Sequence, residues 1–187
     1  MALIAVDIDD TLSMMVQELL DEFNLRSGES LEMKDITGWN LEEACKPENA
    51  HLFMEIMNEP GWFFRPKPRE DALEFVPKLC EQHTVVVAGA YYPCSCLDKV
   101  NWIKKYYPCI DSKNIIFINH KHLLKVDAIV DDGLHNMDSA NGKLPILLDK
   151  PWNQTSHLGA DVCVTSDKVR RAYNWSEVYN IIQEAFN

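Results

Sequence analysis

The chain alternates short, continuous apolar runs with longer segments in which apolar residues recur every three or four positions. Continuous runs are typical of buried strands in a parallel sheet, whereas the wider spacing is typical of amphipathic helices. Strand patterns cover residues 3–8, 84–87, 114–118, 128–132, 145–149 and 161–164. Helical patterns begin near Met15, Asp71, Leu97 and Trp175. Strands that alternate with helices predict an α/β fold with a doubly wound, Rossmann-like parallel sheet.

No strand pattern occurs between the first and second expected strands. The separation of roughly seventy residues is too long for a simple crossover helix. The residues between them show helical patterns and aromatic clusters. We therefore expect a small helical cap at residues 13–69, inserted into an α/β core that is formed by residues 1–12 and 70–187.

Charge and composition narrow the choice of partner. The chain has 187 residues and a formal net charge of −11, which disfavours a nucleic-acid polymer or an anionic membrane, because both require a basic surface. A small phosphorylated ligand remains compatible with this charge. The six cysteines show no disulfide framework, and no secretory signal or membrane-span pattern is present. We expect a cytoplasmic protein with reduced thiols and leave a homodimer open.

Acidic residues follow the first expected strand directly. Side chains alternate in extended chain, so Asp7 and Asp9 point the same way. Two neighbouring carboxylates repel each other unless they share a proton or a cation, and Mg²⁺ prefers such oxygen ligands. The alternative is that these acids are solvated and open the next helix. That alternative suits Asp10 but does not explain an Asp within the apolar run.

A second acidic pair, Asp131 and Asp132, ends a later strand, and Lys125 precedes the pair by six residues. The carboxyl ends of parallel strands form the ligand-binding edge of an open α/β sheet. Two carboxylate clusters at that edge would hold Mg²⁺, which would bridge to a phosphate, and the lysine would neutralise phosphate charge. The combination predicts a phosphate site, although a lone Asp-Asp pair is usually a turn.

These residues resemble the motifs of the haloacid dehalogenase (HAD) superfamily of phosphohydrolases. Residues 7–11 stand at its nucleophile motif, Lys125 at its basic residue, and residues 131–132 at its acidic motif. The sequence looks closest to the 5′(3′)-deoxyribonucleotidase family. The further matches are residues 36–41, 61–65 and 151–153.

The resemblance implies a mechanism and a metal. Asp7 would attack phosphorus and form an aspartyl-phosphate, while Asp9 would protonate the leaving oxygen and then activate water. Mg²⁺ would be bound by Asp7, by the backbone carbonyl of Asp9, and by Asp132 with Asp131 in support. Lys125 would stabilise the nucleophile and the phosphoryl oxygens.

The resemblance also implies substrate contacts. Trp39, Trp62, Phe63 and Phe64 are candidates for stacking on the nucleoside, although the last three fit hinge packing between cap and core equally well.

One position departs from the family pattern. Ala88 stands where the family has a Ser or Thr that hydrogen-bonds the phosphate. Backbone N–H groups of Gly89 and Ala90 are the expected replacements, because Gly permits close approach.

Two other functions remain open. The first is a phosphatase for a different small phosphate ester, and the second is a nucleotide-binding module with weak hydrolysis, because the hydroxyl at position 88 is missing. A phosphoacceptor receiver domain is disfavoured, because its lysine follows the acceptor Asp, whereas Lys125 precedes the last acidic pair.

Overall fold

A single parallel sheet forms the core of the molecule. The computed structural model describes residues 1–137, 143–154 and 169–187. Within this part of the chain, six strands pair in the order β3-β2-β1-β4-β5-β6, and every pair is parallel. The strands are β1 (Leu3–Val6), β2 (Thr84–Gly89), β3 (Ile115–Phe117), β4 (Ala128–Asp131), β5 (Leu144–Leu148) and β6 (Arg170–Ala172). This is the order of a doubly wound sheet, so the predicted fold class is confirmed.

Three long helices pack on one face of the sheet. They are α3 (Glu70–Gln82), α4 (Cys96–Tyr106) and α5 (Trp175–Phe186). Their apolar residues share one buried cluster with strand residues such as Ile4, Val87 and Val130. The opposite face packs against Ile118 and Leu124, which flank η6 (Lys121–Leu123), and against Leu134 of η7 (Leu134–Asn136). Both faces of the central strands are therefore covered, which explains their continuous apolar sequences.

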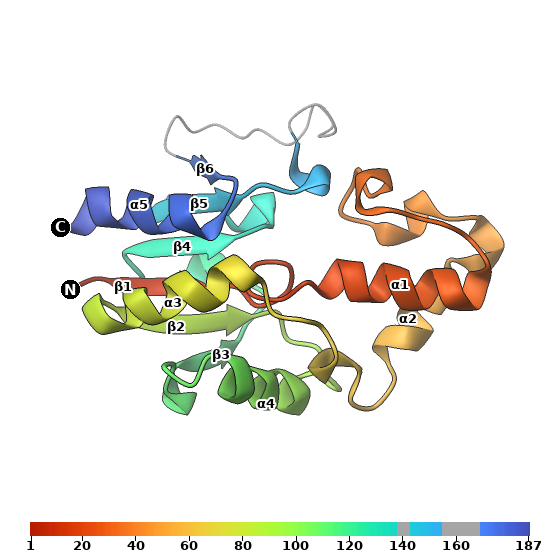
Figure 1. Cartoon of the computed structure of the whole chain (residues 1–187), viewed down its shortest axis with the longest axis horizontal. Coiled ribbons are helices and arrows are strands. Elements are labelled where there is room, and N and C mark those ends of the chain that lie inside the picture. The colour runs from red at the N-terminus through yellow and green to blue at the C-terminus, as the bar shows by residue number, and fades with distance from the viewer. Residues whose placement is uncertain (138–142, 155–168) are drawn as a thin grey trace.

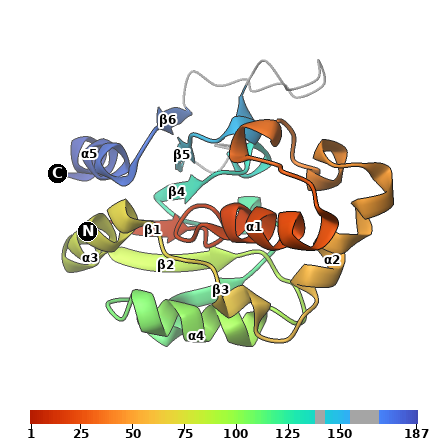
Figure 2. The ribbon, with the colours of Figure 1, turned by 45° about the vertical axis from the view of Figure 1, so that its right-hand side comes forward.

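A helical cap follows the first strand, as predicted. Figures 1 and 2 show it beyond the carboxyl ends of the strands. It contains α1 (Met15–Ser27), η1 (Met33–Asp35), η2 (Leu41–Ala44), η3 (Pro47–Asn49), α2 (His51–Met57) and η4 (Trp62–Phe64). These helices surround a separate apolar cluster, in which Phe23 stacks on Phe53 with ring centroids 4.1 Å apart. We call residues 13–69 the cap segment, and these boundaries stay a prediction.

The two ends of the cap segment lie side by side. Ser13 and Pro68 form an isolated antiparallel bridge. The Met14 amide donates to the Lys67 carbonyl at 2.8 Å, and the Arg69 amide donates to the Leu12 carbonyl at 2.9 Å. The chain thus leaves the core and re-enters it at one place.

Most of the predicted elements are present with small shifts in their ends. β1 stops at Val6, two residues earlier than predicted, and β6 was not predicted at all. The expected strand at 161–164 lies outside the described residues. The remaining elements of the core are η5 (Ser112–Asn114) and η8 (Pro151–Asn153). Among the described residues, no helix is long and apolar enough to cross a membrane.

Candidate active site

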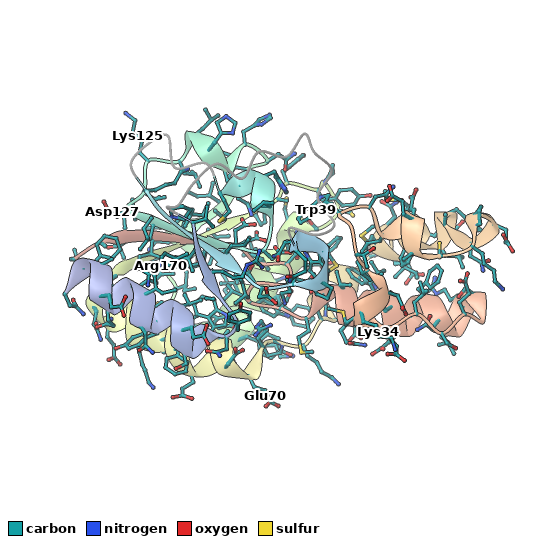
Figure 3. The ribbon with its side chains drawn as sticks, turned by 90° about the horizontal axis from the view of Figure 1, so that it is seen from above. Lys34, Trp39, Glu70, Lys125, Asp127 and Arg170 are labelled. Carbon is teal, nitrogen blue, oxygen red and sulfur yellow. The ribbon has the colours of Figure 1, made fainter. Side chains whose placement is uncertain are left out.

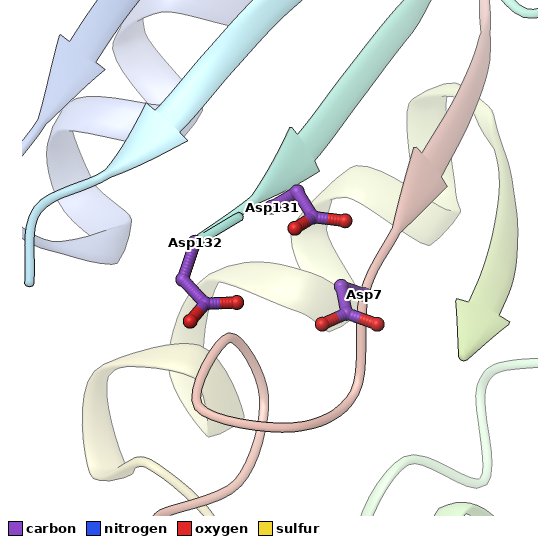
Figure 4. Close-up of side chains that lie close together, drawn as sticks. All are labelled: Asp7, Asp131 and Asp132. Atoms are coloured by element: carbon purple, nitrogen blue, oxygen red, sulfur yellow. The ribbon is translucent and has the colours of Figure 1, made fainter. Parts of the chain in front are cut away.

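Three buried carboxylates converge at the carboxyl ends of β1 and β4 (Figure 4). Asp7 directly follows β1, Asp131 is the last residue of β4, and Asp132 comes next. One oxygen from each side chain lies within 4.8 Å of the others. β1 and β4 are neighbours at the point where the strand order reverses, which is where open α/β sheets bind ligands. The structure therefore brings together the two acidic clusters that the sequence places 124 residues apart (131 − 7).

Hydrogen bonds distinguish Asp131 from Asp132. Asp131 Oδ1 accepts from the Gly133 amide at 2.7 Å and from Asn136 Nδ2 at 3.0 Å, and its Oδ2 accepts from Lys121 Nζ at 2.6 Å. Both oxygens of Asp131 are thus engaged by protein donors. Asp132 Oδ2 accepts from Trp152 Nε1 at 2.8 Å. Asp132 has more capacity for an outside ligand, because this bond occupies Oδ2 with a single neutral donor, whereas three donors occupy the two oxygens of Asp131.

The carboxylates are poorly stabilised as a metal-free group. Burial, partly opposed by Lys121, raises the pKa of Asp7 from 3.8 to about 7. Burial and the nearby charges of Asp131 and Asp7 raise the pKa of Asp132 well above its usual range. Like charges at short distance in a buried site resist ionisation until a cation or proton joins them. A divalent cation fits this group of hard oxygen ligands.

The lysine of the site is Lys121, so the prediction of Lys125 is wrong. Lys121 Nζ lies 2.6 Å from Asp7 Oδ1 and 2.6 Å from Asp131 Oδ2, and the side chain is buried. Burial lowers the pKa of Lys121, but the two carboxylates outweigh it and raise the pKa overall. Lys125 is exposed, and Figure 3 shows it well away from Trp39. The turn η6 directs the earlier lysine inward.

A second buried lysine, which the sequence reasoning did not find, contacts Asp9. Lys99 lies in the first turn of α4 and is 2 % exposed. Its Nζ donates to Asp9 Oδ2 at 2.6 Å and also approaches the Ala90 carbonyl at 3.5 Å. Its ammonium lies 4.8 Å from the ring centroid of Phe63. Lys99 therefore holds Asp9 in place. The position of Lys99 in a helical sequence pattern does not by itself indicate this role.

Asp10 stabilises the turn that follows β1, beside the site. It has a positive φ of 55°, which is uncommon for a non-glycine residue. Both of its carboxylate oxygens accept from the Val16 amide, at 3.1 and 3.2 Å, near the start of α1. The chain turns sharply from β1 into the cap segment here, and Asp10 fixes that turn.

A pocket of about 350 Å³ opens above the acids, between core and cap segment. Its acidic wall contains Asp7, Asp9, Asp131 and Asp132. The cap segment contributes further lining residues, which are Met15, Val16, Gly38, Trp39 and Leu41.

An aromatic pair stands at this pocket. The ring of Trp39 meets His135 edge-to-face, with centroids 4.7 Å apart. Of the four predicted aromatic contacts, Trp39 alone lines the pocket.

The other three predicted aromatics pack within the cap segment and its hinge. Trp62 is 0 % exposed, and Phe63 is 7 % exposed in the same apolar cluster. Phe64 is partly exposed, and Lys105 Nζ lies over its ring, 5.0 Å from the ring centroid. None of the three is a lining residue of the pocket. In this structure residues 62–64 therefore lie in packing positions and not at the pocket.

The end of β2 also differs from the expectation. Ala88 is buried among Ala5 and Ile129 within the sheet, so it does not face the pocket. Ala90 lines the pocket, whereas Gly89 does not. A Cβ at Gly89 would lie 2.7 Å from Ile8 Cδ1, so the glycine permits close packing against the acidic motif. The pocket position without a hydroxyl is Ala90, not Ala88.

Comparison with known proteins identifies a family model that matches almost the whole chain. Residues 1–186 match the model described as 5′ nucleotidase, deoxy (Pyrimidine), cytosolic type C protein.

Two curated relatives and one solved structure are similar over most of their lengths. A 5′(3′)-deoxyribonucleotidase from Clostridium acetobutylicum is 30% identical over 154 residues, which cover 82% of this chain and 85% of the relative. A putative 5′(3′)-deoxyribonucleotidase from Staphylococcus aureus is 29% identical over 177 residues, with 94% and 92% covered. A haloacid dehalogenase-like hydrolase from Streptococcus pneumoniae superposes with a TM-score of 0.63 at 14% identity, with 98% and 99% covered. The last likeness supports the fold.

Proposed function

Because this chain belongs to the family of 5′ nucleotidase, deoxy (Pyrimidine), cytosolic type C proteins, we propose that it removes phosphate from deoxyribonucleoside monophosphates. Family membership makes it a HAD-type nucleotidase phosphatase. The observation that carries the proposal is the position of Asp7 at the end of β1, beside Asp131, Asp132 and Lys121. A buried nucleophile, a cation site and a fixed lysine are the groups that phosphoryl transfer requires.

We propose Mg²⁺ as the cation. The fit rests on three buried carboxylates whose oxygens are closely grouped and on the raised pKa values of two of them, Asp7 and Asp132. Asp7 and Asp132 would be its side-chain ligands, with the backbone carbonyl of Asp9 as a third. Asp131 would support them, because its oxygens already accept from Lys121, Gly133 and Asn136. When bound, Mg²⁺ would neutralise charge on the transferring phosphoryl group.

The first step is attack on the substrate by the side chain of Asp7. A carboxylate oxygen of Asp7 forms a bond to phosphorus, and the bond between phosphorus and the nucleoside oxygen breaks. Asp9 gives its proton to that oxygen, so that a neutral nucleoside leaves. Lys121 holds Asp7 in place and offsets negative charge beside it, since its ammonium already contacts this carboxylate at 2.6 Å.

The second step releases phosphate and restores the enzyme. Water attacks phosphorus of the aspartyl-phosphate, Asp9 takes a proton from the water, and the bond to Asp7 breaks. Lys99 would orient Asp9 for both steps through its contact at 2.6 Å. The proton that Asp9 takes from water restores the acid that the next first step uses.

The cap side of the pocket would bind the nucleoside. Trp39 and His135 provide aromatic surface at the pocket, and Trp39 is 60% exposed. A planar base can stack on an exposed indole. The Ala90 backbone would replace the missing hydroxyl near the phosphate. The free thiols among the described cysteines support a reducing location, and we propose the cytoplasm.

The test is phosphate release from a panel of deoxyribo- and ribonucleoside monophosphates, measured with Mg²⁺ and with EDTA. We expect release from deoxynucleotides only with the metal, and loss of release in Asp7→Asn. Release of phosphate only from other phosphate esters would contradict the proposed substrate class. Saturable binding of nucleotides without release of phosphate would contradict the proposed hydrolysis.

A pair of lysine variants tests the assignment of the basic residue. Lys121→Met should lower kcat by roughly 10²–10³-fold, because it removes a fixed charge beside the nucleophile. Lys125→Met is the matched control, since this lysine is exposed, and it should keep kcat within about twofold. Steady-state kinetics of both variants provide the measurement. Equal losses in the two variants would contradict the role of Lys121.

A further inference from the structure

Trp152 is a core residue whose ring packs in the cap. It lies in η8, which follows β5. The side chain is 5% exposed and belongs to the apolar cluster of the cap segment together with Val16 and Ile36. Among the described residues, it is the one buried member of that cluster from outside residues 13–69. η8 also packs against η1 of the cap segment.

The polar edge of the same ring contacts the acidic group. Trp152 Nε1 donates to Asp132 Oδ2 at 2.8 Å. This bond fixes the rotation of the carboxylate and leaves Asp132 Oδ1 for another ligand. Bonds from outer groups to metal-binding side chains set their orientation, and their loss weakens metal binding.

The turn that carries Trp152 is itself anchored to the core. The side chain of Asn153 donates to the Asp132 carbonyl and to the Leu148 carbonyl, both at 2.8 Å. Arg171 of β6 donates to the Asn153 side chain at 2.8 Å and to its carbonyl at 2.9 Å. The backbone of η8 is thus fixed, so that the ring of Trp152 responds mainly to its cap neighbours.

We propose that Trp152 is a positioning residue that couples the packing of the cap segment to the metal-binding geometry of Asp132. The inference rests on the proposed function, because it assumes that Asp132 binds a divalent cation. When the cap packs against the ring, the indole N–H holds Asp132 in its binding orientation. When that packing loosens, the carboxylate gains rotational freedom and binds the cation less well.

The first experiment compares two buried tryptophans. Trp152→Phe keeps an aromatic ring but removes the N–H. Trp102→Phe is the matched control, because Trp102 is 1% exposed and its Nε1 donates to the Pro66 carbonyl at 2.7 Å, not to a carboxylate. Mn²⁺ binding to the substrate-free proteins is measured by electron paramagnetic resonance. We expect Trp152→Phe to weaken Mn²⁺ binding at least about tenfold and Trp102→Phe to leave it unchanged.

The second experiment tests the coupling to the cap. Ile36→Ala removes apolar contacts from the cluster around Trp152 without touching its hydrogen bond. Ile182→Ala is the control, because it is an equally buried isoleucine of α5 in the core cluster. We expect Ile36→Ala to weaken Mn²⁺ binding several-fold more than Ile182→Ala. Equal affinities would overturn the coupling.

A measurement on the wild-type protein tests the inference even if the variants do not fold. The indole ¹H–¹⁵N resonance of Trp152 should shift on addition of Mg²⁺ more than that of Trp102. Equal affinities of Trp152→Phe and Trp102→Phe, or an unmoved Trp152 resonance, would overturn this inference alone. A wild-type protein that binds neither Mn²⁺ nor Mg²⁺ would overturn the metal site of the proposed function as well.

Discussion

At the scale of single residues, Asp132 is kept in a position that disfavours its charge. It is buried beside Asp131 and Asp7, which raises its pKa well above the usual range. Asp132→Asn removes this charge but retains an oxygen that can accept from Trp152. We expect the metal-free variant to be more stable than the wild type by about 1–3 kcal/mol, because it lacks a carboxyl group whose raised pKa opposes folding at neutral pH.

The same variant should lose its response to the metal. Thermal unfolding with EDTA and with Mg²⁺ measures both effects, and Asp21→Asn on the exposed side of α1 serves as the control. A variant that is less stable without metal, or that still gains stability with Mg²⁺, would contradict the assignment of Asp132.

Lys99 gives a second prediction at this scale. Lys99→Met should lower kcat about 10²–10³-fold, because Asp9 loses the group that orients it for proton transfer. Mn²⁺ affinity should change little, since Lys99 contacts no carboxylate of the three-residue group in any described bond. Kinetics together with Mn²⁺ titration separate the two effects. Lys104→Met, an exposed lysine of the same helix, should behave as the wild type.

Residue-scale sequence reasoning found the acids but chose the wrong lysine. Strand alternation and the position of each acid after an apolar run are local properties, so Asp7 and Asp131 could be predicted. Lys121 and Lys125 both precede the second acidic pair, and only the η6 turn decides which one is buried. Lys99 lies on a helix far along the chain, and its contact with Asp9 is a tertiary property.

At the scale of elements, the end of β2 is closely packed against the acidic motif. Gly89→Ala would place a Cβ 2.7 Å from Ile8 Cδ1 and 3.3 Å from Ile8 Cγ1. Ile8 is 2% exposed and stands between Asp7 and Asp9. We expect a loss of about 1–3 kcal/mol in stability from overpacking, and a larger relative loss of kcat because both acids are displaced.

Urea unfolding and steady-state kinetics test this prediction. In the urea experiment, Gly38→Ala is the control for a glycine-to-alanine change with room for the methyl group, since its nearest neighbour would be Glu43 Oε2 at 3.8 Å. If Gly89→Ala kept wild-type kcat, the packing of Ile8 would not control the acids.

Periodicity predicted the long elements well and the short ones poorly. Helices α1, α3, α4 and α5 show repeated apolar positions over eleven or more residues, which is a strong signal. β6 consists of Arg170, Arg171 and Ala172 at the edge of the sheet, and its charged residues give no apolar run. The aromatic residues 62–64 were ambiguous because buried packing and ligand stacking use the same side chains.

At the scale of the whole molecule, proton and metal binding oppose each other. Burial raises the pKa of Asp7 to about 7 in the folded, metal-free protein, above the value of 3.8 that applies to the unfolded chain. Asp7 therefore makes a contribution to stability that falls as pH rises through this window. Cation binding requires the ionised form, so it should strengthen as pH rises through about 7.

The rise in melting temperature that a fixed Mg²⁺ concentration gives should thus be larger at pH 8 than at pH 6. Differential scanning fluorimetry with and without Mg²⁺ at both values measures it, and Asp132→Asn is the control without a complete site. An equal rise at both values would contradict competition between protons and metal at this site.

The architecture as a whole followed from sequence because its signals accumulate over many residues. The alternation of strands and helices indicated the parallel sheet, and the long interval without strand patterns indicated the cap after β1. Which cap residues face the pocket depends on how the cap packs against the core, and no local pattern records that packing.

The neighbouring ends of the cap segment make it an exchangeable module. The bridge between Ser13 and Pro68 and the two flanking backbone bonds close the segment at its base, without any strand crossing the junction. Recombination at these two points would exchange one lid for another while the sheet and its acids keep their pairing. A fold joined in this way can acquire new substrates by cap exchange, as long as the new cap packs against Trp152, which contacts Asp132.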